Sequence, residues 1–124
     1  MTNPTKPDVV LPSTVPTSLV VEDLVEGDGD EAANGALVDV HYVGVALSTG
    51  AEFDSSYDRG DPLTFRLGAG QVISGWDRGV RGMRVGGRRQ LTIPPHMGYG
   101  ARGIGGVIKP DETLVFVCDL VGVH

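Results

Sequence analysis

The hydrophobic and polar positions of this chain alternate over short runs, which is typical of β-strands. Residues 37–45 alternate and are rich in β-branched side chains, so they predict a longer strand. The run 113–121 is apolar with little alternation, which predicts a central strand that is buried on both faces. The other segments predicted to be extended are shorter and lie at 19–25, 51–53, 63–67 and 88–93.

One segment has the spacing of a helix. Trp76, Val80 and Met83 recur at i, i+4 and i+7, which places them on one stripe of a short helix. Ser74 is a favourable N-cap residue, and Asp77 supplies an acidic partner like that of a capping box. Because nearly everything else is predicted to be strand, we expect a wrapping sheet to bury the indole of Trp76, the only tryptophan. The indole then either floors a ligand pocket or simply packs in the core, and this segment alone leaves both possibilities open.

Strands followed by one helix and then further strands predict an α+β fold with an antiparallel sheet. The segments 54–62 and 96–111 are rich in glycine and polar residues and are predicted to be loops. The 124 residues suffice for one domain with a single core. Residues 1–17 are rich in proline and threonine and lack periodicity, so we expect a flexible N-terminal arm before a domain at 18–124.

Composition and charge narrow the class of protein. The formal net charge of −6 argues against nucleic acid or an anionic membrane as a partner. No stretch approaches the roughly 20 apolar residues of a membrane-spanning helix, and residues 1–16 lack the apolar region of a secretory signal. The lone cysteine, Cys118, excludes an internal disulfide and is compatible with a reducing compartment. We therefore expect a soluble, cytoplasmic and monomeric protein.

Motifs that usually carry covalent or cofactor chemistry are poorly placed here. Segment 98–103 matches G-x-G-x-x-G in letters, but prolines precede it and glycines follow it, so no helix can present its N-terminus to a pyrophosphate. The three histidines lack the spacing of a metal site, and Ser55 and Ser56 lack a glycine elbow. Cys118 falls in the middle of an apolar run, where a thiol is expected to be buried and inert. We expect neither a metal nor a cofactor.

A cluster of arginines extends from the predicted helix into the next strand and contains half of the ten basic residues of the chain. Such a cluster is either a charged outer face or a surface for a partner, and the first is the commoner case. Its members are Arg78, Arg81, Arg84, Arg88 and Arg89.

A set of aromatic and apolar residues with few polar partners remains, spread over five motifs. The motifs are His41-Tyr42-x-Gly44, Gly50-x-x-Phe53-Asp54-Ser55-Ser56, Val72-Ile73-x-Gly75-Trp76-x-x-Gly79-Val80, Tyr99-Gly100-Ala101 and Leu114-Val115-Phe116. In these motifs the chain resembles the FKBP-type peptidyl-prolyl cis/trans isomerases, which also bind the macrolides tacrolimus and rapamycin. The likeness runs in order from Leu19 to Val123, and several ordered motifs are more specific than any one alone.

The resemblance implies an antiparallel half-barrel wrapped round one short helix, with a pocket between helix and sheet. Trp76 would form the pocket floor, the Ile73 N–H would donate to a substrate carbonyl, and the Tyr99 hydroxyl would donate to a second one. The residues to which the likeness gives catalytic roles are Tyr42, Phe53, Asp54, Ile73, Trp76, Tyr99 and Phe116. Those to which it gives substrate-binding roles are Arg59, Leu63, Val72, Ile104 and Ile108.

At the rim of this pocket the resemblance places Asp54, held by Arg59 and Tyr42. Two departures from the family pattern concern the neighbouring walls. Ile104 stands where many members have a histidine, and Leu63 stands where an aromatic residue is common. Neither departure concerns the floor, so we expect activity to persist with an altered peptide preference.

The pocket suggests how rotation about an X–Pro bond could be accelerated. This rotation crosses a free-energy barrier of about 18–20 kcal/mol. The twisted amide is less polar than the planar one because its resonance is lost. A dry aromatic pocket therefore favours the twisted state, and no nucleophile, metal or cofactor is needed. The predicted function is a peptidyl-prolyl isomerase acting on proline-containing peptides and folding proteins. The alternative is a module that binds proline-bearing partners without turnover.

Overall fold

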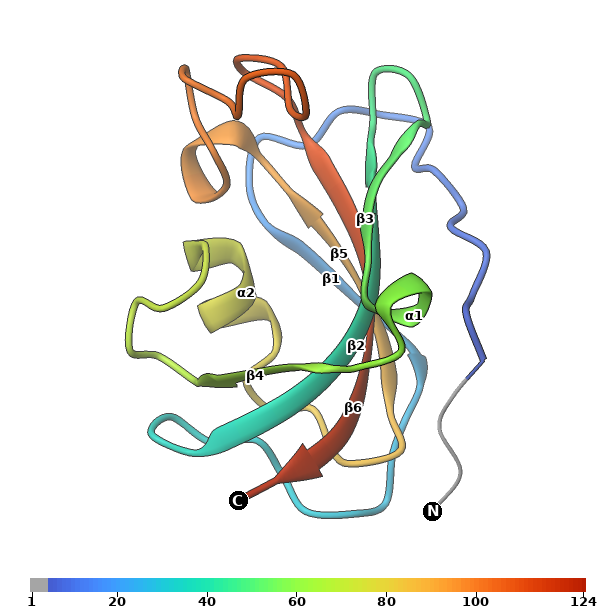
Figure 1. Cartoon of the computed structure of the whole chain (residues 1–124), viewed down its shortest axis with the longest axis vertical. Coiled ribbons are helices and arrows are strands. Elements are labelled where there is room, and N and C mark those ends of the chain that lie inside the picture. Colours follow the sequence, from blue (N-terminus) through green and yellow to red (C-terminus); the bar gives the residue numbers. More distant parts are fainter. Residues whose placement is uncertain (1–4) are drawn as a thin grey trace.

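The structure, a computed structural model, describes residues 5–124 of the chain. Its centre is one six-stranded sheet in the order β1-β5-β6-β2-β3, with β4 also paired to β2 (Figure 1). All pairs of neighbouring strands are antiparallel, which confirms the predicted α+β class with an antiparallel sheet. The strands are β1 (Val20–Val25), β2 (Leu37–Ala46), β3 (Glu52–Ser55), β4 (Leu63–Arg66), β5 (Arg88–Ile93) and β6 (Leu114–Val123).

Two short helices lie on opposite sides of the sheet (Figure 1). The sheet curves around α2 (Ser74–Gly79) as the predicted half-barrel, while α1 (Ser56–Arg59) lies on the outer side. A single 3-10 turn, η1 (Pro95–Met97), follows β5. The prediction of a loop at 54–62 is wrong in its first half, because β3 continues to Ser55 and α1 follows directly. Gly60, with φ of 81°, then ends α1 in the left-handed conformation that glycine tolerates.

The start of α2 differs from the predicted cap. Ile73 is the N-cap residue, and the hydroxyl of Ser74 donates to the Met97 carbonyl at 3.4 Å. Asp77 does not form a capping box either, because its carboxylate accepts hydrogen bonds from two N–H groups of the loop 68–70, at 2.9 and 3.0 Å. These N–H groups have no strand partner, so the carboxylate of Asp77 satisfies them and ties the loop to the helix.

The helical stripe is buried between helix and sheet, as predicted. Trp76, Val80 and Met83 are 3%, 0% and 3% exposed, although the helix proper ends before Val80 and the stripe continues into the following turn. Gly75 allows the close approach of α2 to β5, because a Cβ at this position would lie 2.6 Å from Cγ2 of Ile93. The indole of Trp76 is therefore held in the interior by a helix that packs directly on the sheet.

The predicted central strand lies at the centre of the sheet. β6 pairs with β5 along one edge and with β2 along the other, and its residues 114–120 are buried. By contrast, β1 is an edge strand and is exposed along its whole length. The long strand β2 pairs with β6 on one edge and with both β3 and β4 on the other.

The N-terminal segment passes along the outer side of the sheet, next to α1 (Figure 1). In residues 5–12, Lys6 pairs with Glu52 and Asp58, and the Val10 carbonyl accepts from Gln90 Nε2 at 3.0 Å. Residues 1–4 of the predicted arm lie outside the described residues, and the domain boundary at 18 stays a prediction. No helix within residues 5–124 is both long enough and apolar enough to cross a membrane.

Candidate functional site

A hollow of about 330 Å³ lies between the N-terminal end of α2 and the inner face of the sheet. Strands β2, β3, β4 and β6 contribute to its walls, together with the segment that leads into α2. All seven residues predicted to be catalytic line this hollow, as do Leu63 and Val72 from the substrate-binding set. The fold therefore brings together residues that are up to 74 positions apart, from Tyr42 to Phe116.

The walls of the hollow are aromatic rings that meet edge to face. Tyr42 and Phe116 both stand nearly perpendicular to Trp76, with ring centroids 4.8 and 5.3 Å away and interplanar angles of 86° and 89°. Phe53 in turn meets Phe116 at 5.5 Å and 89°. Such pairs contribute about 0.5–1.5 kcal/mol each beyond the area they bury. Each ring therefore fixes its neighbour, and the hollow has a defined shape without a ligand.

A glycine on β2 makes room for these rings. Gly44 carries no side chain where a Cβ would lie 2.6 Å from Cε1 of Phe116 and 2.8 Å from Cζ of Phe53. Distances this short are not seen for real Cβ atoms, so any larger residue would push both rings out of place. The glycine of the His41-Tyr42-x-Gly44 motif is thus a packing requirement of the aromatic wall.

Three polar side chains at the rim are bound to one another. The Tyr42 hydroxyl donates to Asp54 at 2.6 Å, and Arg59 donates both to Asp54 and to the Tyr42 hydroxyl, the latter at 2.8 Å. Partial burial acts to raise the pKa of Asp54, but hydrogen bonds from Tyr42 and Arg59 outweigh it and hold this pKa below its ordinary value. Burial and the bond to Asp54 raise the pKa of Tyr42 to about 12. Around neutral pH the rim therefore holds an ionised carboxylate and a neutral phenol.

The indole N–H of Trp76 is buried without a partner, and the two donors predicted to hold substrate carbonyls also have no acceptor among residues 5–124. One is the Ile73 N–H, which belongs to the N-cap residue of α2, whereas the Ile73 carbonyl accepts from the N–H groups of Trp76 and Asp77. The other is the hydroxyl of Tyr99, a residue that is 37% exposed and whose pKa is raised by burial and by the charge of Asp54. Both donors are available to an acceptor that enters the hollow.

Three predicted site residues do not line the hollow. Arg59 does not line the hollow but donates hydrogen bonds to two residues that do, Asp54 and Tyr42. Ile108 is 4% exposed and belongs to the core, and Ile104 is 38% exposed at the surface. The two isoleucines exchange backbone hydrogen bonds of 2.8 Å, which close the flap loop into a tight turn. Their substrate-binding roles stay predictions.

Three lining residues were given no role by the sequence: Thr64, Phe65 and Gln71. Phe65 belongs to the aromatic and apolar set found in the sequence, although it was given no individual role, and its ring centroid lies 5.7 Å from that of Trp76. Gln71 accepts a hydrogen bond from the Arg66 N–H at 2.8 Å. Its position directly before Val72 is the only feature of the sequence that points to the hollow.

Two reactive side chains outside the hollow, His41 and Cys118, are buried inside the fold. His41 is 3% exposed, bonds Ser56 through Nδ1 at 2.8 Å and stacks on Tyr57. Cys118 is completely buried, and this burial raises the pKa of its thiol well above the usual range. The prediction of a buried cysteine is confirmed, and His41 is hydrogen-bonded and not exposed.

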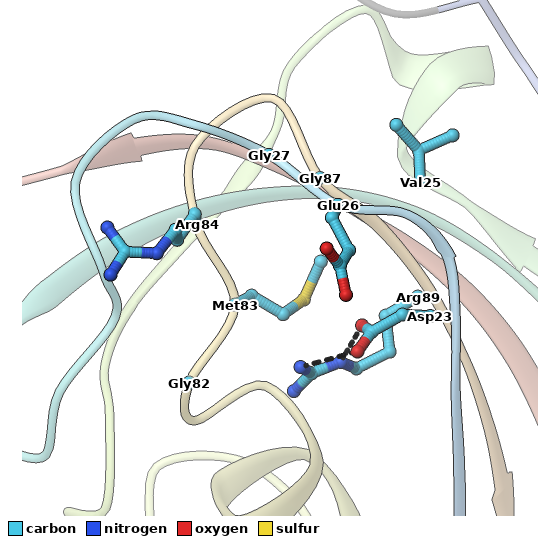
Figure 2. A pocket seen from close by; sticks show the side chains of 9 residues that line it. All are labelled: Asp23, Val25, Glu26, Gly27, Gly82, Met83, Arg84, Gly87 and Arg89. Carbon is cyan, nitrogen blue, oxygen red and sulfur yellow. Dashed lines mark hydrogen bonds and ion pairs between the residues drawn. The ribbon is translucent and has the colours of Figure 1, made fainter.

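A second, smaller hollow of about 230 Å³ lies beyond the other end of α2 (Figure 2). Figure 2 shows Arg89 paired with Asp23 across it, with Glu26 nearby. Arg89 also donates to the carbonyls of Gly79 and Arg81, and Arg84 pairs with Glu31, so part of the arginine cluster is engaged in the structure. This hollow contains none of the residues predicted for the site.

Comparison with known families identifies the family of the chain. The family described as FKBP-type peptidyl-prolyl cis-trans isomerase matches residues 29–121 of the chain. The chain belongs to this family. It is accordingly a peptidyl-prolyl cis-trans isomerase, and the aromatic hollow of this FKBP-type domain lies entirely within the matched residues.

Individual relatives agree with this assignment over nearly the whole chain. An FK506-binding protein of Streptomyces anulatus is 62% identical over 120 residues, which cover 95% of this chain and 97% of that protein. An FK506-binding protein of Neisseria meningitidis serogroup A is 58% identical over 107 residues, which cover 86% of this chain and 97% of that protein. The crystal structure of AtFKBP13 superposes with a TM-score of 0.80 at 44% identity, covering 90% of this chain and 98% of that one. The crystal structure of FkpA from Escherichia coli superposes with a TM-score of 0.78 at 39% identity, and the match covers 94% of this chain and 52% of that one.

Proposed function

We propose that this isomerase binds an X–Pro segment in the hollow beside Trp76 and accelerates its rotation by removing water from the amide. The observation that carries the proposal is the composition of the wall, which is built from rings packed edge to face. The ionised groups at its rim, Asp54 and Arg59, are bound to each other. An amide inside the hollow therefore exchanges water for aromatic surface.

This exchange acts on the two states of the amide unequally. The planar amide is the more polar one and loses more hydration in an apolar site, so the barrier to the less polar twisted form falls. The unaided barrier is about 18–20 kcal/mol, and each 1.4 kcal/mol removed gives about a tenfold faster rotation. A lowering of roughly 5–7 kcal/mol would make a useful catalyst without a nucleophile or a metal.

Two donors are suited to hold the peptide in the twisted geometry. The Ile73 N–H and the Tyr99 hydroxyl lack acceptors within the described part of the chain, and both belong to residues that line the hollow. A hydrogen bond that fits the twisted amide better than the planar one lowers the barrier further. In this proposal Ile73 and Tyr99 orient the substrate, while the rings supply the apolar environment.

The same hollow would accept FK506-type macrolides. Relatives that are 62% and 58% identical carry the name FK506-binding protein, and the aromatic wall, the Ile73 N–H and the Tyr99 hydroxyl offer such a ligand an apolar surface and two donors. Leu63 and Ile104, the two departures from the family pattern, would alter the contacts of the ligand around these shared groups. The proposed physiological substrates are folding proteins, acted on in the cytoplasm by a monomer.

A titration with tacrolimus that follows the fluorescence of Trp76 tests the pocket, and an NMR exchange or protease-coupled assay on an X–Pro peptide tests the chemistry. We expect saturable quenching or enhancement of this fluorescence, inhibition of the isomerase rate by the macrolide, and loss of the rate in Trp76→Leu, a variant without a tryptophan that is therefore tested by its rate alone. Tight macrolide binding without any isomerase rate would instead select the alternative of a non-catalytic binding module. Absence of both binding and rate in the folded wild-type chain would refute the proposal.

A further inference from the structure

α1 is only four residues long, yet it connects the outer side of the sheet to the rim of the hollow. Ser56 Oγ accepts the Tyr42 N–H at 2.6 Å, at the point where β3 and β4 part and leave this edge of β2 without a strand partner. The hydroxyl of Tyr57 donates to the buried carboxylate of Asp119 on β6. The last residue, Arg59, reaches the rim. The orientation of Arg59 therefore depends on how firmly α1 is held on its outer side.

The N-terminal segment contacts α1 on that outer side (Figure 1). Nζ of Lys6 lies 2.9 Å from a carboxylate oxygen of Glu52 and 3.0 Å from one of Asp58. Glu52 begins β3 and Asp58 precedes Arg59 in α1, so one ammonium group bridges both ends of the segment 52–59. Hydrogen bonds to Glu52 and Asp58 raise the pKa of Lys6 above its ordinary value, so the ammonium group is charged at neutral pH.

A second contact of the same segment reinforces the first. The carbonyl of Thr5, next to Lys6, accepts from Nη2 of Arg88 at 2.8 Å. Nε of Arg88 donates to Asp119 at 2.8 Å, and Asp119 is the carboxylate that accepts from Tyr57. Thus both Thr5 and Lys6 are connected to α1, one through the network of Arg88 and the other directly.

We propose that Lys6 is a positioning residue of the isomerase: by bridging Glu52 and Asp58 it fixes the segment that carries Asp54 and Arg59. Arg59 then holds the Tyr42 hydroxyl and Asp54 in the orientation that the rim requires. This inference rests on the proposed function of the hollow. It makes the N-terminal segment a working part of the isomerase domain.

The expected effect is modest, because the bridge is partly exposed. The side chains of Lys6, Glu52 and Asp58 are 37%, 38% and 60% exposed. Exposed ion pairs of this kind change an equilibrium constant by about fivefold at most and are weakened by salt. We therefore expect Lys6→Ala to lower kcat/KM about two- to fivefold at low salt, whereas Lys6→Arg, which keeps the charge, restores most of the loss.

The test uses full-length variants and an uncharged X–Pro peptide, with kcat, KM and the thermal midpoint measured for each. Arg78→Ala is the matched control, since it removes one exposed positive charge from α2, and this side chain forms no hydrogen bond or ion pair within residues 5–124. At about 1 M salt, where screening extends over only roughly 3 Å, the wild type and Lys6→Ala should converge. In a double-mutant cycle, Lys6→Ala and Asp58→Asn should be less than additive.

Each outcome decides between positioning and a merely structural role. Positioning is supported if Lys6→Ala lowers kcat/KM at low salt while its thermal midpoint is unchanged. In that case Lys6→Arg should restore kcat/KM, and high salt should remove the difference from the wild type. The positioning role is overturned if the wild type and Lys6→Ala have equal kcat/KM, or if the loss of kcat/KM in Lys6→Ala persists at high salt. It is also overturned if Arg78→Ala loses as much kcat/KM as Lys6→Ala. An inactive wild type would overturn the proposed function of the hollow, whereas an active wild type with an unaffected Lys6→Ala overturns only this inference.

Discussion

Gly44 on β2 and Phe116 on β6 are direct partners in the antiparallel register, and the ring of Phe116 occupies the space where a side chain of residue 44 would be. A Cβ on Gly44 would lie 2.6 Å from this ring. The same ring meets Trp76 at 5.3 Å and Phe53 at 5.5 Å. One backbone position without a side chain therefore decides the arrangement of three of the rings that line the hollow.

Gly44→Ala should destabilise the fold and lower activity together. The added methyl overpacks the wall, which typically costs about 1–3 kcal/mol of unfolding free energy, and it displaces Phe116 and Phe53. Denaturant unfolding and the isomerase assay measure the two effects. Gly105→Ala is a control for unfolding, because a Cβ there would meet nothing within 4 Å. Unchanged stability in Gly44→Ala would show that the wall yields without strain.

The pH dependence of stability should report the ionised state of Asp54. Its folded-state pKa lies below the ordinary value of 3.8, so the ionised carboxylate stabilises the fold above that pH and this contribution is lost as pH falls through it. The unfolding free energy of the wild type should therefore exceed that of Asp54→Asn near neutral pH, and the difference should fade between about pH 5 and pH 2. Since the carboxylate is 39% exposed, we expect less than about 1 kcal/mol. A difference that grows towards acid would contradict this assignment.

Tyr99→Phe should retain most of the isomerase activity. The change removes one hydroxyl donor and leaves the ring, so the loss is that of a single hydrogen bond, about 1 kcal/mol or roughly fivefold in rate. The measurement is kcat/KM on an X–Pro peptide, with Trp76→Leu as the comparison that removes an aromatic wall. If Tyr99→Phe abolished activity, hydrogen bonding rather than removal of water would be the main effect.

Cys118 should be unreactive in the native protein. The thiol is 0% exposed in the central strand, and burial raises its pKa, so little thiolate forms and none is accessible. A thiol reagent should label the single cysteine in denaturant and leave it unlabelled in buffer. Rapid labelling under native conditions would mean that β6 opens far more often than a central strand should.

The strands could largely be predicted from the sequence, because their patterns reflect burial directly. Residues 88–93 were predicted with the bounds that the structure gives, and the continuous apolar run at 113–121 correctly indicated the central strand β6. The cap of α2 could not be predicted in the same way. Asp77 bonds the loop 68–70, and which donors a carboxylate reaches depends on how the chain folds back.

α1 escaped prediction because four residues are too few to show a helical period. Its helix is held by contacts with distant strands, through Ser56 to β2 and Tyr57 to β6, which no local pattern contains. The aromatic residues of the hollow were found because their motifs resemble a known family. The placement of Ile108 in the core and of Ile104 at the surface depends on the tight turn of the flap, which a sequence rich in glycine leaves open.

The position of β6 in the sheet has a consequence for how this protein is made. The strand that joins β5 to β2 is the last of the six along the chain, so a nascent polypeptide that ends before Leu114 has two half-sheets with nothing between them. Pairings between residues as far apart as Val38 and Val123 also close slowly, because long loops must be ordered first. This isomerase should therefore complete the folding of its sheet only after β6 has left the ribosome.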